Sequence, residues 1–217
     1  MAFLTIERDG GILTATMNQP ETRNALTGNT AVQEFVQLCE DVRKDASVKV
    51  LIITAAGPIF SSGGNVKDMK RFFDDALTPD LIREEYRQGI QQIPNALVQL
   101  DVPVICAING PAIGAGLDLT CMCDIRIASE TATFAESFVR VGIVPGDGGA
   151  WLLPRAVGMA KASEMAFTGE PISAQEALAC GLVSRVVAAD QLLPTARALA
   201  AKIAANPGAV MRMTKRL

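Results

Sequence analysis

Three glycine-rich stretches and the aspartates near them are the residues of this chain best suited to chemistry. An apolar run ends at Asn109-Gly110-Pro111, and Gly114-Ala115-Gly116 then precedes an apolar segment with helical spacing. The first-turn N–H groups of a helix carry partial positive charge, so the Ala115 N–H can hold a developing oxyanion. Asp118 lies three residues later, on the same helix face. We predict that the Ala115 N–H is an oxyanion donor beside the Asp118 carboxylate. The structural alternative is an ordinary glycine turn, followed by an acid that only interacts with the helix dipole.

Two further glycine loops resemble this stretch in composition. Residues 60–69 lie between a buried strand and a predicted helix, and such a loop can add a second N–H to a shared anion site. An ordinary glycine-rich connection is the alternative there. Residues 142–151 contain Asp147, which is either a turn residue bonded to its own backbone or a second carboxylate facing Asp118.

The composition decides which groups are able to move protons. The chain of 217 residues contains no histidine. Ser-His and Cys-His nucleophilic sites, histidine bases and most catalytic metal sites are thereby removed, and acid–base work falls to carboxylates. The net charge of −3, with Lys and Arg scattered, provides no basic face for nucleic acid.

The cysteines and the apolar runs indicate a cytoplasmic protein without a metal site. The cysteines are odd in number and most lie in apolar stretches, as reduced core thiols do: Cys39, Cys106, Cys121, Cys123 and Cys180. One residue separates Cys121 from Cys123, and no second pair completes a metal site. No apolar run approaches the ~18 residues of a membrane helix. We therefore expect no metal, no membrane partner and no nucleic-acid partner.

The elements that must position these groups follow a layered α/β order. The Asp9-Gly10 dipeptide predicts a hairpin between strands at 3–7 and 12–17, and a helix then ends near Asp45. The β-branched run at 48–54 predicts a strand buried on both faces. The remaining predictions are helical segments at 70–100, 156–166, 174–180 and 191–205, with strands at 124–129 and 182–187.

Three segments in matching order make the chain resemble the crotonase family, also called the enoyl-CoA hydratase/isomerase superfamily. They are residues 18–26, residues 60–69, and residues 107–129 together with 142–155. The resemblance implies an α/β fold, a spiral of repeated ββα units with a C-terminal helical region. It implies a core domain at 1–190, with 191–217 as the start of a shortened C-terminal helical region. Assembly as a homotrimer or a dimer of trimers is also implied.

The resemblance implies an acyl-CoA thioester as substrate and no cofactor beyond the coenzyme A that the substrate carries. Gly64 and Ala115 match the residues whose N–H groups hold the thioester oxygen. The matching coenzyme A contacts are Ser62, Gly63, Gly64, Asn65 and Ala115 along the loops, Arg23, Ala25 and Leu26 on the adenine and pantetheine, and Arg23 and Lys67 at the phosphates.

The acid residues match the family only in part. Asp118 takes the place of the first catalytic glutamate, which makes it the first choice for the general acid/base. Phe138 stands at the position of the second glutamate, and Glu136, two residues earlier, is expected to point elsewhere. Asp147 is the candidate second acid. Two carboxylates permit hydration and one suffices for isomerisation of an enoyl thioester in fatty-acid or related metabolism. A catalytically weak acyl-CoA-binding member of the fold is the alternative.

Overall fold

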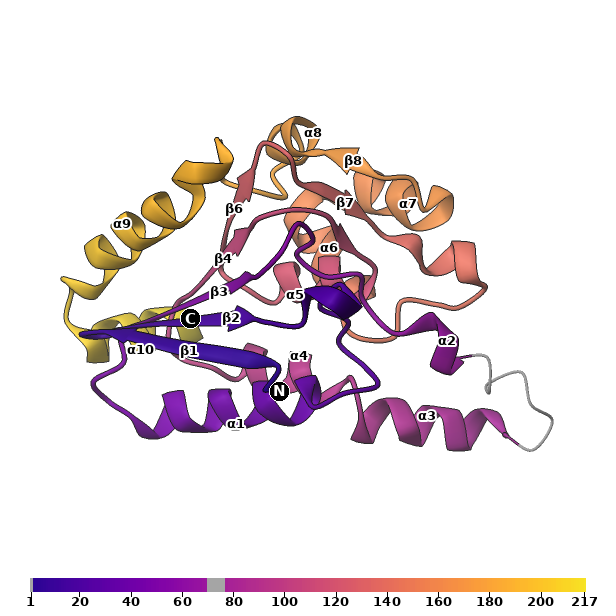
Figure 1. The fold of residues 1–217 in the computed structure, drawn as a ribbon, viewed down its shortest axis with the longest axis horizontal. Helices are drawn as coiled ribbons and strands as arrows, with labels where there is room; N and C mark the ends of the chain where they lie inside the picture. Colours follow the sequence, from indigo (N-terminus) through magenta and orange to yellow (C-terminus); the bar gives the residue numbers. More distant parts are fainter. Residues whose placement is uncertain (1, 70–76) are drawn as a thin grey trace.

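A six-stranded sheet and a three-stranded sheet frame the molecule (Figure 1), in a computed structural model that describes residues 2–69 and 77–217. The larger sheet has the order β1-β2-β3-β4-β6-β9, and the smaller has β5-β7-β8. The strands are β1 (Leu4–Asp9), β2 (Ile12–Met17), β3 (Val50–Ala55), β4 (Val104–Ile108), β5 (Ala112–Ile113), β6 (Ile125–Ser129), β7 (Thr133–Ala135), β8 (Ile172–Ser173) and β9 (Arg185–Val187).

Helices and short 3₁₀ turns connect and cover these strands. The helices are α1 (Ala31–Lys44), α2 (Val66–Met69), α3 (Pro79–Gln88), α4 (Gln92–Val98), α5 (Ala115–Cys121), α6 (Gly149–Val157), α7 (Met159–Thr168), α8 (Ala174–Ala179), α9 (Leu192–Ala204) and α10 (Gly208–Arg216). The 3₁₀ turns are η1 (Pro20–Thr22), η3 (Ser137–Val141) and η4 (Ala189–Gln191). No helix in the described ranges has both the length and the apolar character needed to cross a membrane.

The predicted opening hairpin is confirmed. β1 and β2 are antiparallel, with Leu4 opposite Met17 and Asp9 opposite Ile12. Gly10 closes the turn at φ +56°, in the left-handed region that glycine enters without a Cβ penalty. Every later strand added to the larger sheet is parallel to its neighbour.

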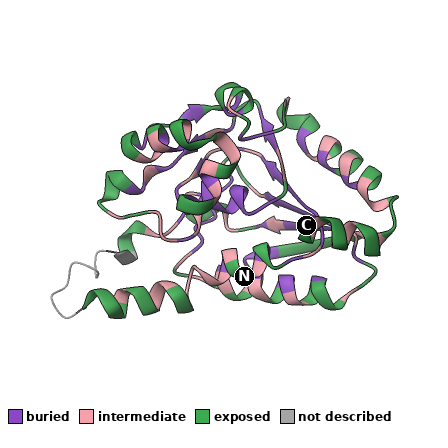
Figure 2. Cartoon of the chain, turned by 180° about the vertical axis from the view of Figure 1, so that it is seen from behind, coloured by how far each residue is buried: buried purple, intermediate pink, exposed green. Residues whose placement is uncertain are grey.

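The prediction that β3 is buried on both faces is also confirmed. Leu51 and Ile53 point into a large core, whereas Val50 and Ile52 point into a second core built with α9. The strands at the centre are accordingly buried, and the helices present exposed faces outward (Figure 2). α9 lies on the side of the larger sheet opposite α1 (Figure 1). Alternating side chains thus serve two layers at once.

The order strand, strand, helix occurs twice along the chain and determines where the site lies. β4 joins the larger sheet, β5 joins the smaller one, and α5 follows; β6, β7 and η3 repeat this order. The chain therefore winds between two sheets, and the turns from the smaller sheet into helices collect in one region. The turn into α5 contains Gly114, the turn into η3 contains Glu136, and the loop between η3 and α6 contains Asp147.

Two predicted helical segments differ in detail from the structure. The segment expected at 156–166 is divided between α6 and α7, because Gly158 adopts φ +79° between them. The segment expected at 70–100 contains α3 and α4, separated at Gly89. Its residues 70–76, with Lys70 and Arg71, lie outside the described residues. The strand expected at 182–187 is shorter and begins at Arg185.

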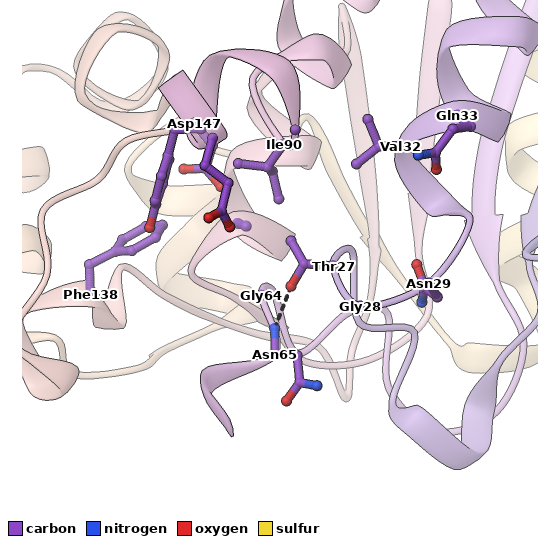
Figure 3. Close-up of a pocket in the computed structure, with 14 residues that line it drawn as sticks. Thr27, Gly28, Asn29, Val32, Gln33, Gly64, Asn65, Ile90, Phe138 and Asp147 are labelled. Carbon is purple, nitrogen blue, oxygen red and sulfur yellow. Dashed lines mark hydrogen bonds between the residues drawn. The ribbon is translucent and has the colours of Figure 1, made fainter. Parts of the chain in front are cut away.

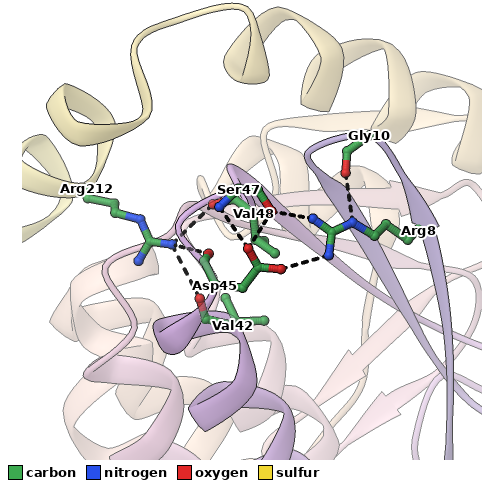
Figure 4. A network of polar contacts seen from close by, with 7 residues as sticks. All are labelled: Arg8, Gly10, Val42, Asp45, Ser47, Val48 and Arg212. Atoms are coloured by element: carbon green, nitrogen blue, oxygen red, sulfur yellow. Dashed lines mark hydrogen bonds and ion pairs between the residues drawn. The ribbon is translucent and has the colours of Figure 1, made fainter.

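A polar network ties the C-terminal helix to the rest of the fold (Figure 4). Arg212 of α10 donates from Nη2 to the carbonyl oxygens of Val42, Asp45 and Val48 at 3.3, 3.0 and 3.2 Å. Its other terminal nitrogen pairs with Asp101. The carbonyl groups of Val42 and Asp45 at the end of α1, and of Val48 in the loop that follows, thereby gain a donor that the helix does not supply.

The network predicts a marked loss of stability in Arg212→Ala. The substitution removes charge-assisted hydrogen bonds from a half-buried guanidinium, and we expect a loss of about 2 kcal/mol in the free energy of unfolding. Urea denaturation measures this loss. Arg197→Ala is the matched control, because Arg197 and its partner Glu7 are both exposed and such a pair is worth less than about 1 kcal/mol. Equal losses in the two variants would contradict the anchoring role.

Candidate active site

Close approach of two glycine loops forms one end of the site. Ser61 pairs with the chain before α5 through Ser61 N–H to Pro111 O and Ile113 N–H to Ser61 O, at 3.2 and 3.0 Å. A Cβ on Gly116 would lie 2.5 Å from the Ser61 carbonyl oxygen, so only glycine fits there. The first turn of α5 therefore rests directly on the loop at residues 61–64.

The two predicted oxyanion donors lie along this contact. Gly63 has φ +80°, and a Cβ on it would lie 3.1 Å from the Ala115 nitrogen. Ala115 begins α5, where an N–H group has no acceptor within the helix. The Gly64 N–H makes no backbone hydrogen bond to another residue in the described ranges. Gly64 and Ala115 thus keep N–H donors in one small region.

A cavity of about 380 Å³ opens on these loops (Figure 3). Phe138 and Asp147 lie at one end of it, and Asn29 and Gln33 lie at the other. We call it the site cavity, and its walls are Thr27, Gly28, Asn29, Val32, Gln33, Gly64, Asn65, Glu85, Tyr86, Gly89, Ile90, Ala115, Phe138 and Asp147.

Of the two predicted acids, Asp147 lines the site cavity and Asp118 does not. Asp147 sits in the turn before α6, directly ahead of Gly148, whose φ of +114° begins the helix. Asp118 is fully buried in the first turn of α5 and lies behind that wall. The carboxyl next to the predicted oxyanion donor in sequence is therefore not the one that lines the cavity.

The start of α6 covers the Asp118 carboxyl. A Cβ on Gly149 would lie 2.1 Å from Asp118 Oδ1, so the bare Cα of Gly149 lies against that oxygen. Both oxygens of Asp118 are buried without a hydrogen-bond donor among residues 2–69 and 77–217. The contact fixes the distance between α5 and α6.

Glu136 does not line the site cavity, but it lies close to Asp118, which the sequence analysis did not predict. β7 ends at Ala135, the carbonyl of which accepts the Gly114 N–H at 2.8 Å, and η3 begins at Ser137. The change from strand to 3₁₀ turn directs Glu136 inward, where it is 1% exposed and interacts with Asp118. Asp118, Glu136 and Asp147 form what we call the three-carboxyl cluster.

Burial controls the ionisation of this cluster. Loss of water, then the charges of Asp147 and Glu136, raise the pKa of Asp118 well above its usual range. Burial raises the pKa of Glu136 to about 7 and also raises that of Asp147, whereas hydrogen bonding with Asp118 opposes both increases. Tyr86 faces the cluster from α3, and burial with the nearby Asp147 charge raises its pKa. Asp118 is therefore the member that keeps a proton.

The predicted coenzyme A contacts divide into an inner and an outer set. The Leu26 N–H donates to Gly63 O at 2.9 Å and the Ser62 N–H donates to Arg23 O at 3.0 Å, so the two segments pair. Ala25 and Leu26 are buried behind the cavity wall. Arg23 and Lys67 are exposed beyond the cavity wall.

One predicted contact lies in the wall itself. Asn65 lines the cavity and its N–H donates to Thr27 Oγ1 at 2.8 Å (Figure 3). The bond joins the loop at 60–69 to the segment that leads into α1.

Sequence reasoning missed the wall contributed by α1 and α3. Val32 and Gln33 come from the start of α1, and Glu85, Tyr86 and Ile90 come from α3 and the residues after it. Helical periodicity marked the core side of these segments and carried no signal for a second, cavity-facing side. For Glu136, the available signal was the strand-ending position before Ser137.

The chain belongs to the enoyl-CoA hydratase/isomerase family, whose model matches residues 7–217. A probable enoyl-CoA hydratase of Mycobacterium tuberculosis is 36% identical over 213 residues, covering 98% of this chain and 79% of that protein. The 1,2-epoxyphenylacetyl-CoA isomerase of Escherichia coli is 34% identical over 211 residues, covering 95% and 78%. The crystal structure of an enoyl-CoA hydratase from Bacillus anthracis superimposes with a TM-score of 0.90 at 31% identity, covering 99% and 81%.

These relatives confirm the family resemblance and the expected fold class. The protein is an enzyme of the hydratase/isomerase family with a mixed α/β fold and a C-terminal helical region. Among the residues that the structure describes, no three His, Cys, Asp or Glu side chains are placed to hold a metal ion.

The contact between α6 and α5 predicts that Gly149→Ala is destabilising. The new methyl group would overlap the Asp118 carboxyl, and we expect a loss of about 1–3 kcal/mol, as for other overpacked cores. Gly208→Ala is the control, because that glycine begins α10 and a Cβ on it would make only an ordinary 3.8 Å contact with Lys49 Cγ. Combining Gly149→Ala with Asp118→Ala should recover part of the loss in urea denaturation. Additive losses would contradict the contact.

The three-carboxyl cluster predicts that stability falls as pH rises through neutrality. Its members have a higher pKa in the folded chain, so the folded protein binds more protons than the unfolded protein between about pH 5 and pH 7. We expect the free energy of unfolding to decrease by about 1.4 kcal/mol per pH unit for each such proton. Glu34 and Glu176, whose pKa values are lowered, are ionised in both states there and add no slope.

Urea denaturation at pH 5, 6, 7 and 8 measures this slope. Asp118→Asn removes the group with the strongly raised pKa and should flatten the profile. A wild-type stability that is constant or increases over this range would contradict a protonated buried cluster.

Proposed function

We propose that this enzyme acts on an acyl-CoA thioester, holding the thioester oxygen with the N–H groups of Gly64 and Ala115 while Asp147 moves a proton. One observation supports the proposal above all others. Two backbone donors and one carboxylate line the same cavity, although they come from three separate turns of the chain.

The chemistry follows from where negative charge develops. Removing a proton beside a thioester, or adding water to an enoyl thioester, transfers an electron pair toward the carbonyl oxygen. Two N–H donors stabilise that oxygen without changing their own charge, and one such donor is worth about 3 kcal/mol in a transition state. Asp147, with its pKa raised by burial, is suited both to accept and to return a proton near neutral pH.

Isomerisation of a double bond is the reaction that this arrangement supports best. A single carboxylate can remove a proton from the α carbon and return it to the γ carbon, with the electron pair passing through the enolate. Of the two expected acids only Asp147 reaches the cavity, which supports a one-acid shuttle. Asp118 then acts from behind, as a hydrogen-bond donor to Asp147.

Hydration is the second candidate, because Glu85 of α3 places another carboxylate in the cavity wall. Water would be activated at one carboxylate and the proton delivered from the other. Coenzyme A would approach along residues 62–65, with its phosphates toward the exposed Arg23 and Lys67. The family resemblance supports a homotrimer or a dimer of trimers, which sedimentation analysis would test.

The proposed roles predict unequal effects of two isosteric substitutions. Asp147→Asn removes the proton carrier and should lower kcat for 3-enoyl-CoA isomerisation by about 10²–10⁴-fold. Asp118→Asn keeps a donor where a neutral carboxyl stood, so its loss should be at least about tenfold smaller. Rates with 3-enoyl-CoA and crotonyl-CoA distinguish isomerase from hydratase.

Binding of a saturated acyl-CoA is the control for both variants. It should remain within about twofold of wild type, because neither side chain holds the coenzyme. If the wild type binds acyl-CoA but catalyses neither reaction, the chain is the catalytically weak binding member of the fold. If Asp118→Asn loses more activity than Asp147→Asn, the assignment of Asp147 is wrong.

A further inference from the structure

The three-carboxyl cluster contains more acceptor atoms than donors. Both oxygens of Asp118, Oε2 of Glu136 and Oδ1 of Asp147 are buried without a donor among the described residues. Asp118 lies within hydrogen-bonding reach of both other carboxyls. Ionised carboxylates only accept hydrogen bonds, so the contacts are favourable only if protons are shared between them.

The charged groups around Glu136 leave few ways to place those protons. Asp118 and Cys121 face Glu136 from α5, and Asp147 faces it from the turn before α6. Tyr86 of α3 lies beyond Asp147, and Arg126 of β6 acts on Cys121. No cation acts on Glu136 itself within the part of the chain that the structure describes. A cluster with a single negative charge is therefore favoured over one with two or three.

Glu136 is buried and is absent from the wall of the site cavity. It cannot touch a substrate in that cavity. Any effect it has on proton transfer must pass through Asp118.

We propose that Glu136 is a positioning residue, the outer end of a chain of hydrogen bonds in which protonated Glu136 donates to Asp118 and Asp118 donates to Asp147, whereas ionised Glu136 accepts from Asp118 instead. This inference rests on the proposed role of Asp147. With protons on Glu136 and Asp118, the one negative charge resides on Asp147, which is the member that faces the substrate.

Bonds, protons and electron pairs are all accounted for during turnover. When Asp147 takes a substrate proton, the C–H bond breaks, an O–H bond forms on Asp147, and the electron pair moves to the thioester oxygen. Glu136 and Asp118 keep their protons throughout. When Glu136 loses its proton, near pH 7, a second charge enters the cluster, raises the pKa of Asp147 and slows the return of the proton to the substrate.

Two substitutions of similar size separate this role from simple packing. Glu136→Gln keeps a donor to Asp118 and cannot ionise, whereas Glu136→Met fills the space without a donor. We expect Glu136→Gln to keep wild-type kcat within about twofold at pH 6 and to lack the decline that the wild type shows above about pH 7. Glu136→Met should lose at least about tenfold in kcat at every pH, with KM unchanged.

A measurement without substrate tests the same linkage. In ¹³C NMR titrations of aspartate carboxyls, assigned with Asp118→Asn and Asp147→Asn, Glu136→Gln should lower the apparent pKa of Asp118 by about one unit or more, because one opposing charge is gone. Glu176→Gln is the control, since Glu176 caps α8 at the surface and should leave the titration unchanged.

The outcomes separate this inference from the proposed function. An unchanged Asp118 titration in folded Glu136→Gln overturns the inference whether or not the enzyme is an isomerase. Equal kcat losses in the Gln and Met variants also overturn it, because they show a packing role. A shifted titration in a protein without isomerase activity supports the linkage while contradicting the proposed function.

Discussion

Burial of the Asp118 carboxyl beneath the first turn of α6 is the constraint on which the site depends. The bare Cα of Gly149 lies against that carboxyl, and no N–H or hydroxyl donor in the described ranges satisfies its oxygens. A charge in this position is unfavourable, so a proton is retained and α5 and α6 approach each other closely. Asp147, two residues before Gly149, is then brought to the edge of the cavity. The position of the carboxyl that lines the cavity is thus linked to a neutral carboxyl beside it.

Close backbone contact also positions the Ser61 loop against the start of α5. The Ser61 loop and the start of α5 approach so nearly that Gly63 and Gly116 tolerate no side chain. The Ala115 N–H belongs to the first turn of α5, and the Gly64 N–H belongs to the loop that this turn contacts. An oxyanion site of this kind needs no cation, in keeping with a chain that has no histidine.

Much of the fold and part of the site follow from local patterns. The hairpin at Asp9-Gly10, the doubly buried β3 and the helices α1 and α9 were all predictable, because each depends on turn chemistry or on the period of apolar residues. The loops of Gly64 and Ala115 were found for the same reason. The walls from α1 and α3 were missed, since periodicity marks the face that packs on the core and is silent about a face turned toward a cavity.

Residue types and their spacing in the sequence led to the prediction that carboxylates do the acid–base work, that two glycine loops supply the backbone donors, and that Asp118 and Asp147 lie near them. Tertiary structure alone decided which acid meets the cavity and that Glu136 joins them. Both outcomes depend on the packing of α6 on α5 and on the change from β7 to η3, which turns Glu136 inward. Spacing along one helix tells which residues share a face. The element that covers that face is brought there from elsewhere in the chain.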